Sequence, residues 1–150
     1  MAQKTAWNAA ALTESDIVTY LMGEGGAHTS WTPTCTQSGS VTVTNTRSRY
    51  ARYGRLIVAT FDLTATTAGT SANAVTLSLP VTAAATASGF GTGYILDQGA
   101  AYYVGTWTLT STTAMVLYCH NETGAAGVDP AFALANTDII RGTITYEAAS

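Results

Sequence analysis

The chain has 150 residues with a single lysine, and only 10% of the residues are charged, against about 25% in an average soluble domain. Thr and Ala each occur more than 25 times, and hydrophobic residues make up 47% of the sequence. This length predicts one domain with a sizeable core. The chain has no apolar run of about 18 residues, so we expect no membrane span. The net charge of −3 argues against nucleic-acid binding.

The composition also bears on catalysis and on the compartment. Asp, Glu, His and Lys are scarce, and these side chains supply most general acids and bases. The N-terminal residues contain no continuous apolar segment, so we expect no secretory signal and synthesis in a reducing cytoplasm. The composition therefore favours a protein that packs, assembles or adheres over an enzyme.

Residues 1–30 are expected to form an N-terminal anchor segment. Residues 13–22 begin with a capping-box pattern and continue with apolar residues at helical spacing, which predicts a short helix. The glycine-rich residues 23–26 then end that helix and form a hinge. Because so short a helix is marginal alone in water, we expect it to pack against a partner. The candidate docking residues are Trp7, Ile17, Tyr20 and Leu21.

From residue 31 onward, apolar and polar residues alternate, which predicts β-strands. The candidate strands are 40–44, 55–63, 74–79, 93–96, 101–109, 113–120 and 138–147. Gly142 predicts a bulge in the last of them, and the expected long loops are 64–73, 82–92 and 121–137. No helical segment separates the strands, which disfavours a parallel sheet. We therefore expect an all-β fold over 31–150, an antiparallel β-sandwich of the jelly-roll kind.

A cluster of arginines and tyrosines lies within 47–55. A basic and aromatic cluster is compatible with an anionic partner. It is equally compatible with a strand edge and turn whose arginines pair with acidic groups across a subunit contact, and we favour this second interpretation. The cluster contains Arg47, Arg49, Arg52 and Arg55, with Tyr50 and Tyr53 between them.

The strand-rich region also contains many aromatic residues. Adjacent strand positions face opposite ways, so one of Tyr102 and Tyr103 should point away from the core. Such residues fill cores, line subunit interfaces or stack on sugar rings. We favour the core or an interface and keep glycan contact as the alternative. The candidates for an interface or a ligand-facing surface are Arg49, Arg52, Tyr102, Tyr103 and Trp107.

Three other features are candidate sites. Cys35 and Cys119 are interpreted as buried thiols, with a disulfide as the alternative. Residues 89–93 read G-F-G-T-G and resemble half of a dinucleotide fingerprint. A strand-like segment follows them where that fingerprint needs a helix, so we interpret them as a flexible loop. His120 and Glu122 lack an identifiable third metal ligand. We therefore predict no catalytic residue, no metal and no cofactor.

Two segments contain a recognisable motif. Residues 31–34 read W-T-P-T, and residues 49–58 read R-Y-A-R-Y-G-R-L-I-V. They resemble the W-T-P-T … R-Y-x-R-x-G-R-x-[IV]-x-V pattern of small phage virion proteins, which are minor tail, fibre and capsid-decorating modules. Residues 74–84, AVTLSLPVTAA, resemble the strand of that family that ends in L-P-V-x-A.

The resemblance extends over nearly the whole chain. Residues 93–97 and 136–140 resemble the later strands of the family, although Thr137-Asp138 stands where Gly-Asp is commonest. Residues 12–31 are similar to the short lead of actinobacterial-phage versions. The resemblance implies an antiparallel β-sandwich, frequently trimeric, on the virion exterior. It implies no catalytic residue.

We therefore expect a non-enzymatic bacteriophage virion protein that is assembled in the bacterial host cytoplasm. The expected role is capsid decoration or head fibre, with residues 1–30 docking to the major capsid protein or a tail protein and the β-domain exposed as a homotrimer. The alternative is a minor tail or fibre protein whose β-sandwich binds host cell-surface carbohydrate. A glycan hydrolase is the least favoured hypothesis.

Overall fold

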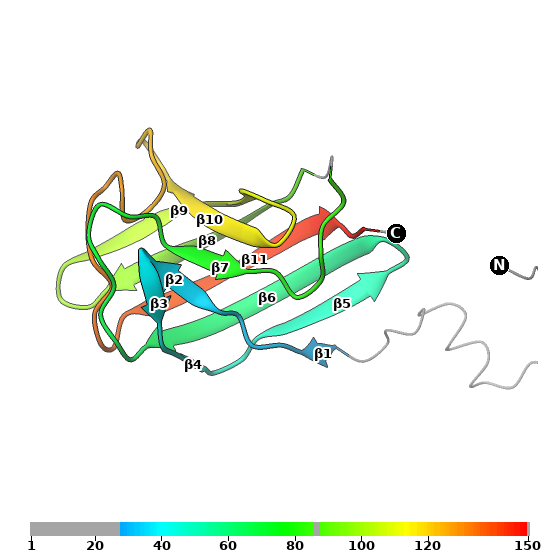
Figure 1. Cartoon of the computed structure of the whole chain (residues 1–150), viewed down its shortest axis with the longest axis horizontal. Coiled ribbons are helices and arrows are strands. Elements are labelled where there is room, and N and C mark those ends of the chain that lie inside the picture. The colour runs from blue at the N-terminus through cyan, green and yellow to red at the C-terminus, as the bar shows by residue number, and fades with distance from the viewer. Residues whose placement is uncertain (1–27, 86–87, 150) are drawn as a thin grey trace, which may run out of the picture.

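The structure is a computed structural model that describes residues 28–85 and 88–149 (Figure 1). Every regular element in these residues is a β-strand. No helix with the length and apolar character of a membrane span occurs among them. The strands are β1 (Thr29–Ser30), β2 (Cys35–Gln37), β3 (Gly39–Val41), β4 (Val43–Asn45), β5 (Arg49–Tyr53), β6 (Leu56–Ala65), β7 (Thr76–Ser78), β8 (Phe90–Asp97), β9 (Ala101–Leu109), β10 (Ala114–Cys119) and β11 (Ile139–Glu147).

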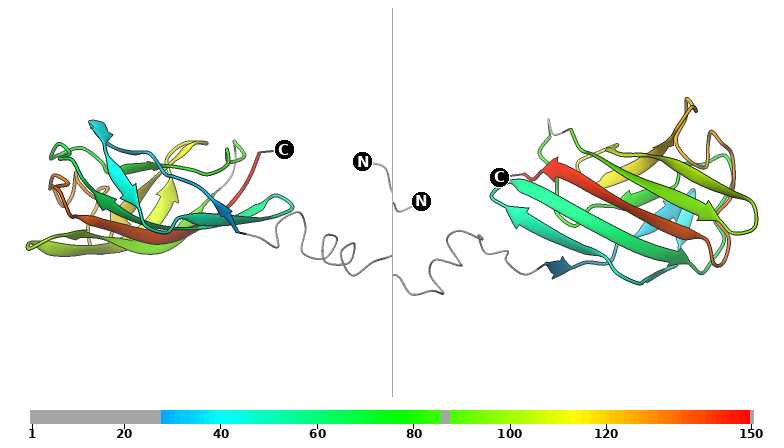
Figure 2. Two further views of the ribbon diagram at one scale, coloured as in Figure 1. Left: turned by 90° about the horizontal axis from the view of Figure 1, so that it is seen from below. Right: turned by 180° about the vertical axis from the view of Figure 1, so that it is seen from behind.

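The strands form one curled antiparallel sheet. Their order is β1-β5-β6-β11-β8-β9-β10-β7-β2-β3, and β4 pairs with the same edge of β6 as β5 does. The left view of Figure 2 shows the sheet bent over on itself, so that β2, β7 and β10 lie above β6 and β11. This half-barrel confirms the prediction of an all-β, antiparallel fold.

Most long strands lie close to their predicted bounds. β9 has the predicted bounds, β11 begins one residue later than expected, and β6 continues past 63 to Ala65. The predicted strand 40–44 is divided between β3 and β4, and the expected loop 82–92 ends early because β8 begins at Phe90. Alternation therefore located most of the long strands, and the errors lie in the short strands and in the first residues of β8.

The predicted bulge at Gly142 is wrong. β11 pairs with β6 without interruption, from Ile139 opposite Thr64 to Glu147 opposite Leu56. A bulge occurs instead between β4 and β5, where the N–H groups of Thr46 and Arg47 both donate to the Asp62 carbonyl at 2.9 and 3.3 Å. Two residues then oppose one, which defines a bulge. This bulge separates two short strands that run along one edge of β6.

The N-terminal predictions concern residues outside the described part of the chain. These are the helix over 13–22, the glycine hinge and the docking residues Trp7, Ile17, Tyr20 and Leu21. Residues 29 and 30, which we assigned to the anchor segment, form β1 and pair with Tyr50 and Arg49 of β5.

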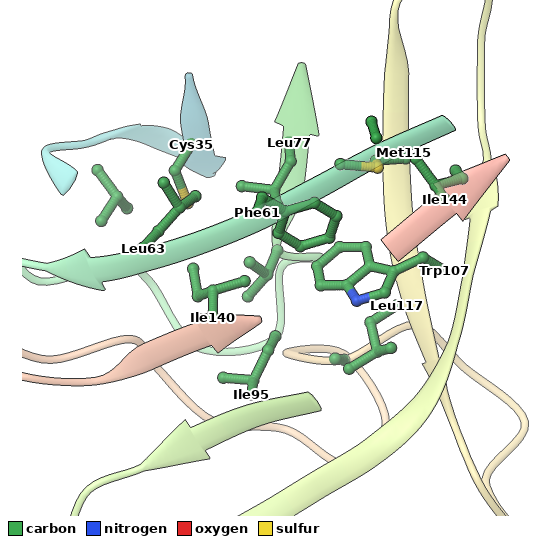
Figure 3. Packing of buried hydrophobic residues seen from close by; sticks show 14 of the residues in the cluster. Cys35, Phe61, Leu63, Leu77, Ile95, Trp107, Met115, Leu117, Ile140 and Ile144 are labelled. Carbon is green, nitrogen blue, oxygen red and sulfur yellow. The ribbon is translucent and has the colours of Figure 1, made fainter. Parts of the chain in front are cut away.

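The inner face of the sheet encloses the core. Side chains from the lower layer, such as Phe61 and Ile140, meet Leu77 and Met115 from the upper layer (Figure 3). Trp107 lies between the layers with no exposed surface. Its ring meets the Phe61 ring edge to face, with centroids 5.1 Å apart, which is a favoured aromatic geometry.

Two glycines make room for the Trp107 indole. A Cβ atom at Gly93 or at Gly142 would overlap the indole Nε1. That Nε1 donates a hydrogen bond to the Arg141 carbonyl at 3.3 Å. The glycine-rich residues 89–93, which we interpreted as a flexible loop, therefore lie mostly within β8. Gly93 allows the close approach of the Trp107 indole, whereas Gly91 allows the close approach of the β11 backbone at Thr143.

A buried glutamine connects β2 to two distant loops. The Gln37 Nε2 donates to the carbonyls of Asn73 and Phe132 at 3.1 and 2.8 Å, and its Oε1 accepts from the Leu134 N–H at 2.9 Å. Gln37 is 1% exposed, so these bonds replace the water that burial removes. The loops after β6 and β10 are thus fixed by one side chain.

Candidate functional site

The outer face of β8, β9 and β10 displays a group of apolar side chains. Side chains alternate between the two faces of a strand, so the strand positions between the core residues point outward. We call Phe90, Tyr94, Tyr102, Val104 and Tyr118 the aromatic face. Phe90 is 70% exposed, Tyr102 65%, Val104 57% and Tyr118 43%. Exposed apolar residues gathered in this way mark interaction surfaces more often than scattered ones do.

The strand register brings four of these side chains together. Tyr94 of β8 lies opposite Val104 of β9, and Leu96 lies opposite Tyr102. Tyr118 of β10 lies opposite Thr106. The Tyr94 and Tyr102 rings are diagonal neighbours with centroids 5.6 Å apart and an interplanar angle of 55°. They form an aromatic pair toward the β8–β9 turn, whereas Phe90 lies toward the other end of the face, opposite Thr108.

Among the described residues, one ion pair lies beside this face, and its two charged groups bond to each other. The Arg141 Nε lies 2.8 Å from the Asp62 Oδ1, and the Arg141 Nη1 donates to the Tyr94 hydroxyl at 3.1 Å. The hydrogen bond that Arg141 donates to Asp62, and then the one that it donates to Tyr94, raises the pKa of Arg141. Because Arg141 and Asp62 neutralise each other, the face presents little net charge to a partner.

The strands beneath the aromatic face are almost uncharged. β9 and β10 contain no charged residue, and β8 contains only Asp97 at its last position. Depletion of charge with enrichment of tyrosine and phenylalanine characterises the centre of protein interfaces. The composition of these strands therefore favours a contact surface.

Three acidic residues, Asp97, Glu122 and Asp129, lie near the ends of β8 and β10. Asp97 pairs with Ala101 and has the same parity along β8 as the buried Ile95, so it lies on the inner side of the sheet and not on the aromatic face. Burial, and then Asp138, raises the pKa of Asp97.

Asp129 is held as a carboxylate by its neighbours. The Thr123 hydroxyl and N–H donate to its Oδ2 at 2.9 and 3.3 Å. These hydrogen bonds lower the pKa of Asp129, because they favour the ionised form. Asp129 therefore keeps its negative charge at neutral pH.

A second exposed group lies on the turn between β5 and β6. Tyr53 and Leu56 are opposite each other in the register and are 52% and 46% exposed. The Arg52 Nε donates to the Gly54 carbonyl at 2.8 Å within the turn. The Arg55 Nε lies 3.1 Å from the Glu147 Oε1. We call Arg49, Arg52, Tyr53, Arg55 and Leu56 the arginine hairpin.

The aromatic residues that the sequence indicated as candidates lie on opposite faces of the sheet. Tyr102 points outward, whereas Tyr103 points inward and stacks on Phe132 with centroids 4.2 Å apart. The choice of Trp107 as an interface or ligand-facing residue is wrong, because it lies opposite Gly91 and Leu117 on the inner face and has no exposed surface. Arg49 and Arg52 are both exposed.

Sequence reasoning missed two members of the aromatic face. Phe90 was assigned to a loop, and Val104 was read only as part of a strand. Both follow from the position of Tyr102, since Val104 is two residues further along the same face. Phe90 shares that face four residues before Tyr94. The signal is the alternation of side chains between the two faces of a strand, counted from one residue that is known to face outward.

Both cysteines are free, buried thiols, and burial raises the pKa of Cys35 to about 12. Within the part of the chain that the structure describes, no group of three or more His, Cys, Asp or Glu side chains is arranged to hold a metal ion.

Comparisons with known proteins do not identify the chain. No protein-family model matches it, and neither a curated protein nor a solved structure does.

Proposed function

We propose that the chain is a non-enzymatic structural protein of a bacteriophage particle, displayed on the exterior as a capsid decoration or head-fibre protein. The observation that carries the proposal is the aromatic face, where Phe90, Tyr102, Val104 and Tyr118 are exposed above almost uncharged strands. Monomeric soluble proteins rarely expose such patches without a contact to make. An assembly protein uses a surface of this kind.

The sequence resemblance supports the virion role. Residues 49–58, which resemble the R-Y-x-R-x-G-R-x-[IV]-x-V pattern, fold as the β5–β6 hairpin. Residues 136–140 lead into β11, as expected for a final strand. The jelly-roll-like sandwich belongs to the proposal, since the curled sheet places β2, β7 and β10 over β6 and β11 (Figure 2).

In this proposal, residues 1–30 dock the protein and the β-domain remains exposed. The docking partner is the major capsid protein or a tail protein. The apolar docking side chains are Trp7, Ile17, Tyr20 and Leu21.

The test compares phage particles assembled with the full chain and with a chain that lacks residues 1–27. We expect the full chain in purified particles. The truncated chain should keep a β-rich far-ultraviolet spectrum and be absent from them. Normal incorporation of the truncated chain contradicts the docking assignment, and absence of the full chain contradicts the virion role. Hundreds of copies per particle indicate the capsid, and a few copies indicate the tail.

A second candidate function is a minor tail or fibre protein that binds host cell-surface carbohydrate. The observation that favours it is the ring pair of the half-buried Tyr94 and the exposed Tyr102 beside Arg141 and Asp62, because rings stack on sugar faces while charged side chains bond to hydroxyl groups. A glycan array tests it. Binding that is lost in Tyr102→Ala and kept in Tyr53→Ala supports this function, and no binding by the unchanged chain contradicts it.

A further inference from the structure

We infer that one water molecule is bound inside the fold where β1, β4 and β5 meet, and that it bridges the side chains of Trp31, Asn45 and Ser48. The inference goes beyond the proposed function and does not depend on it. It assigns a small buried site whose ligand must both donate and accept hydrogen bonds.

Three buried polar atoms carry the inference. Among the described residues, the Trp31 Nε1, the Asn45 Oδ1 and the Ser48 Oγ are shielded from solvent and have no hydrogen-bond partner in the protein. A buried polar atom without a partner costs free energy, so folded proteins supply a partner from the chain itself or from ordered water. All three such atoms belong to one small region, which indicates a common partner.

The strand register brings the three residues together. β1 ends with Ser30 opposite Arg49 of β5. Trp31 and Ser48 continue this register, since the Trp31 N–H donates to the Ser48 carbonyl at 3.3 Å. Residues that lie opposite each other in antiparallel strands have Cβ atoms about 5 Å apart on the same face. Asn45 joins this pair, because its Nδ2 donates to the Trp31 carbonyl at 2.7 Å.

The three side chains all face the inner side of the sheet. Ser48 is 3% exposed, and it lies two residues before Tyr50, which packs against the core. Trp31 packs against the same core, and Asn45 lies opposite the fully buried Leu63. Only the two residues of the bulge between β4 and β5 separate Asn45 from Ser48. The polar atoms therefore border the same enclosed part of the inner face (the region of β1, β4 and β5 in Figure 1).

The hydrogen-bonding chemistry of these atoms determines the ligand. The Trp31 Nε1 can only donate, and the Ser48 hydroxyl can donate or accept. The Asn45 Nδ2 is already bonded to the Trp31 carbonyl and lies 3.4 Å from the Thr32 Oγ1. These contacts fix the orientation of the amide, so the Asn45 Oδ1 can only accept.

This combination excludes an ion. A metal cation would face the Trp31 N–H, and an anion would face the Asn45 amide oxygen, and both contacts are repulsive. The ligand is therefore a neutral molecule with at least one donor and one acceptor.

The enclosure of the site restricts the ligand to water. Because all three atoms are shielded from solvent, a larger molecule reaches them only if the strands separate. A buried water typically makes about three hydrogen bonds to polar groups that otherwise lack partners. Here it accepts from the Trp31 Nε1 and donates to the Asn45 Oδ1 and the Ser48 Oγ.

The bridge connects two parts of the chain that are distant in sequence. Trp31 is the first residue of the W-T-P-T segment, and Ser48 directly precedes the R-Y-A-R-Y segment of β5. The water therefore helps to fix the point where residues 1–30 join the rest of the β-domain.

A high-resolution crystal structure of the full chain tests the inference directly. We expect one solvent peak about 2.7–3.2 Å from each of the three polar atoms. A peak within that distance of fewer than two of them, or no peak, overturns the inference. A side chain from residues 1–27 in the same place also overturns it.

The Ser48→Ala variant provides a second test, in which the sign of the change is decisive. If the Ser48 hydroxyl bonds to the bridging water, its removal raises the unfolding equilibrium constant about two- to tenfold, because a hydrogen bond is lost. If the hydroxyl has no partner, its removal leaves that constant unchanged or lowers it, because a buried polar group without a partner destabilises the folded state.

Urea unfolding measures the constant, with Ser71→Ala at an exposed position as the matched control. We expect Ser48→Ala to be less stable than the control. A Ser48→Ala chain that is as stable as the control, or more stable, overturns the inference.

Discussion

Gly93 determines how closely the Trp107 indole approaches the sheet. A Cβ at this position would overlap the indole Nε1 and the Arg141 carbonyl. We expect Gly93→Ala to destabilise the protein by about 1–3 kcal/mol, the usual cost of overpacking a core. Urea unfolding measures this change. The control is Gly39→Ala, since a Cβ there meets nothing within 4 Å. A Gly93→Ala variant as stable as the control would contradict this packing.

Gln37 is the second residue on which the core depends. Replacing it with Leu removes the partners of the Leu134 N–H and of two carbonyls. A buried polar group left without a partner costs about 1–3 kcal/mol. We therefore expect Gln37→Leu to lower the free energy of unfolding by at least this amount. Gln98→Leu, at an exposed position, should change stability by less than about 0.5 kcal/mol. Equal unfolding midpoints for the two variants would contradict the role of Gln37.

For single residues, the sequence predicts that the Tyr102 and Tyr103 side chains point to opposite faces of the sheet. It does not predict which of the two is buried. β9 has large side chains on both faces, so its own pattern does not identify the inner one. The neighbouring strands decide it, because Gly93 of β8 and Gly142 of β11 leave space for Trp107 on one side only. The pairing of β9 with its neighbours supplies this information, and the sequence of β9 alone does not. For this reason Trp107 was placed on the wrong face.

Strands differ in how firmly the sheet holds them. β11 pairs along nine residues with β6 and also with β8 on its other edge. β3 has three residues and lies at the end of the strand order. Amide groups in central, buried strands exchange slowest, because their exposure requires larger unfolding.

We therefore predict the slowest hydrogen exchange in β6 and β11 and the fastest in β1 and β3. Exchange followed by mass spectrometry over seconds to hours measures the order. Protection of β3 equal to that of β11 would show that the edge of the sheet is covered in solution.

The long strands were predictable because alternation over eight or more residues is hard to mistake. β9 and β11 are examples. β1 and β4 have two or three residues and form only by pairing with β5 and β6, so no local pattern specifies them. The bulge predicted at Gly142 was wrong, because this glycine instead makes room for the Trp107 indole.

Stability of the whole molecule should fall at alkaline pH. Burial raises the pKa of Cys35 from 9.0 to about 12. Burial also raises the pKa of Tyr146 from 10.0 to about 12, and its hydroxyl bonds to Val81. Above pH 9, the unfolded chain releases these protons while the folded chain keeps them. The folded state then binds more protons, so stability decreases as pH rises.

Each of these groups lowers the free energy of unfolding by about 1.4 kcal/mol per pH unit. This applies between the pKa of the group in the unfolded chain and its pKa in the folded chain. We expect the urea midpoint to be steady from pH 7 to 8.5 and to fall from pH 9 to 11. Cys35→Ala lacks the thiol, so its midpoint should fall less steeply between pH 9 and 10. Parallel curves for the two proteins would contradict the burial of this thiol in solution.

The shape and charge of the molecule lead to the central claim that the aromatic face is its assembly surface. Hydroxyl-radical footprinting of the chain, dilute in solution and within purified particles, tests this claim most directly. We predict that Phe90, Tyr102 and Tyr118 are oxidised in the dilute chain and protected in particles, while Trp107 is protected in both. Equal oxidation of these three residues in both samples would contradict the claim.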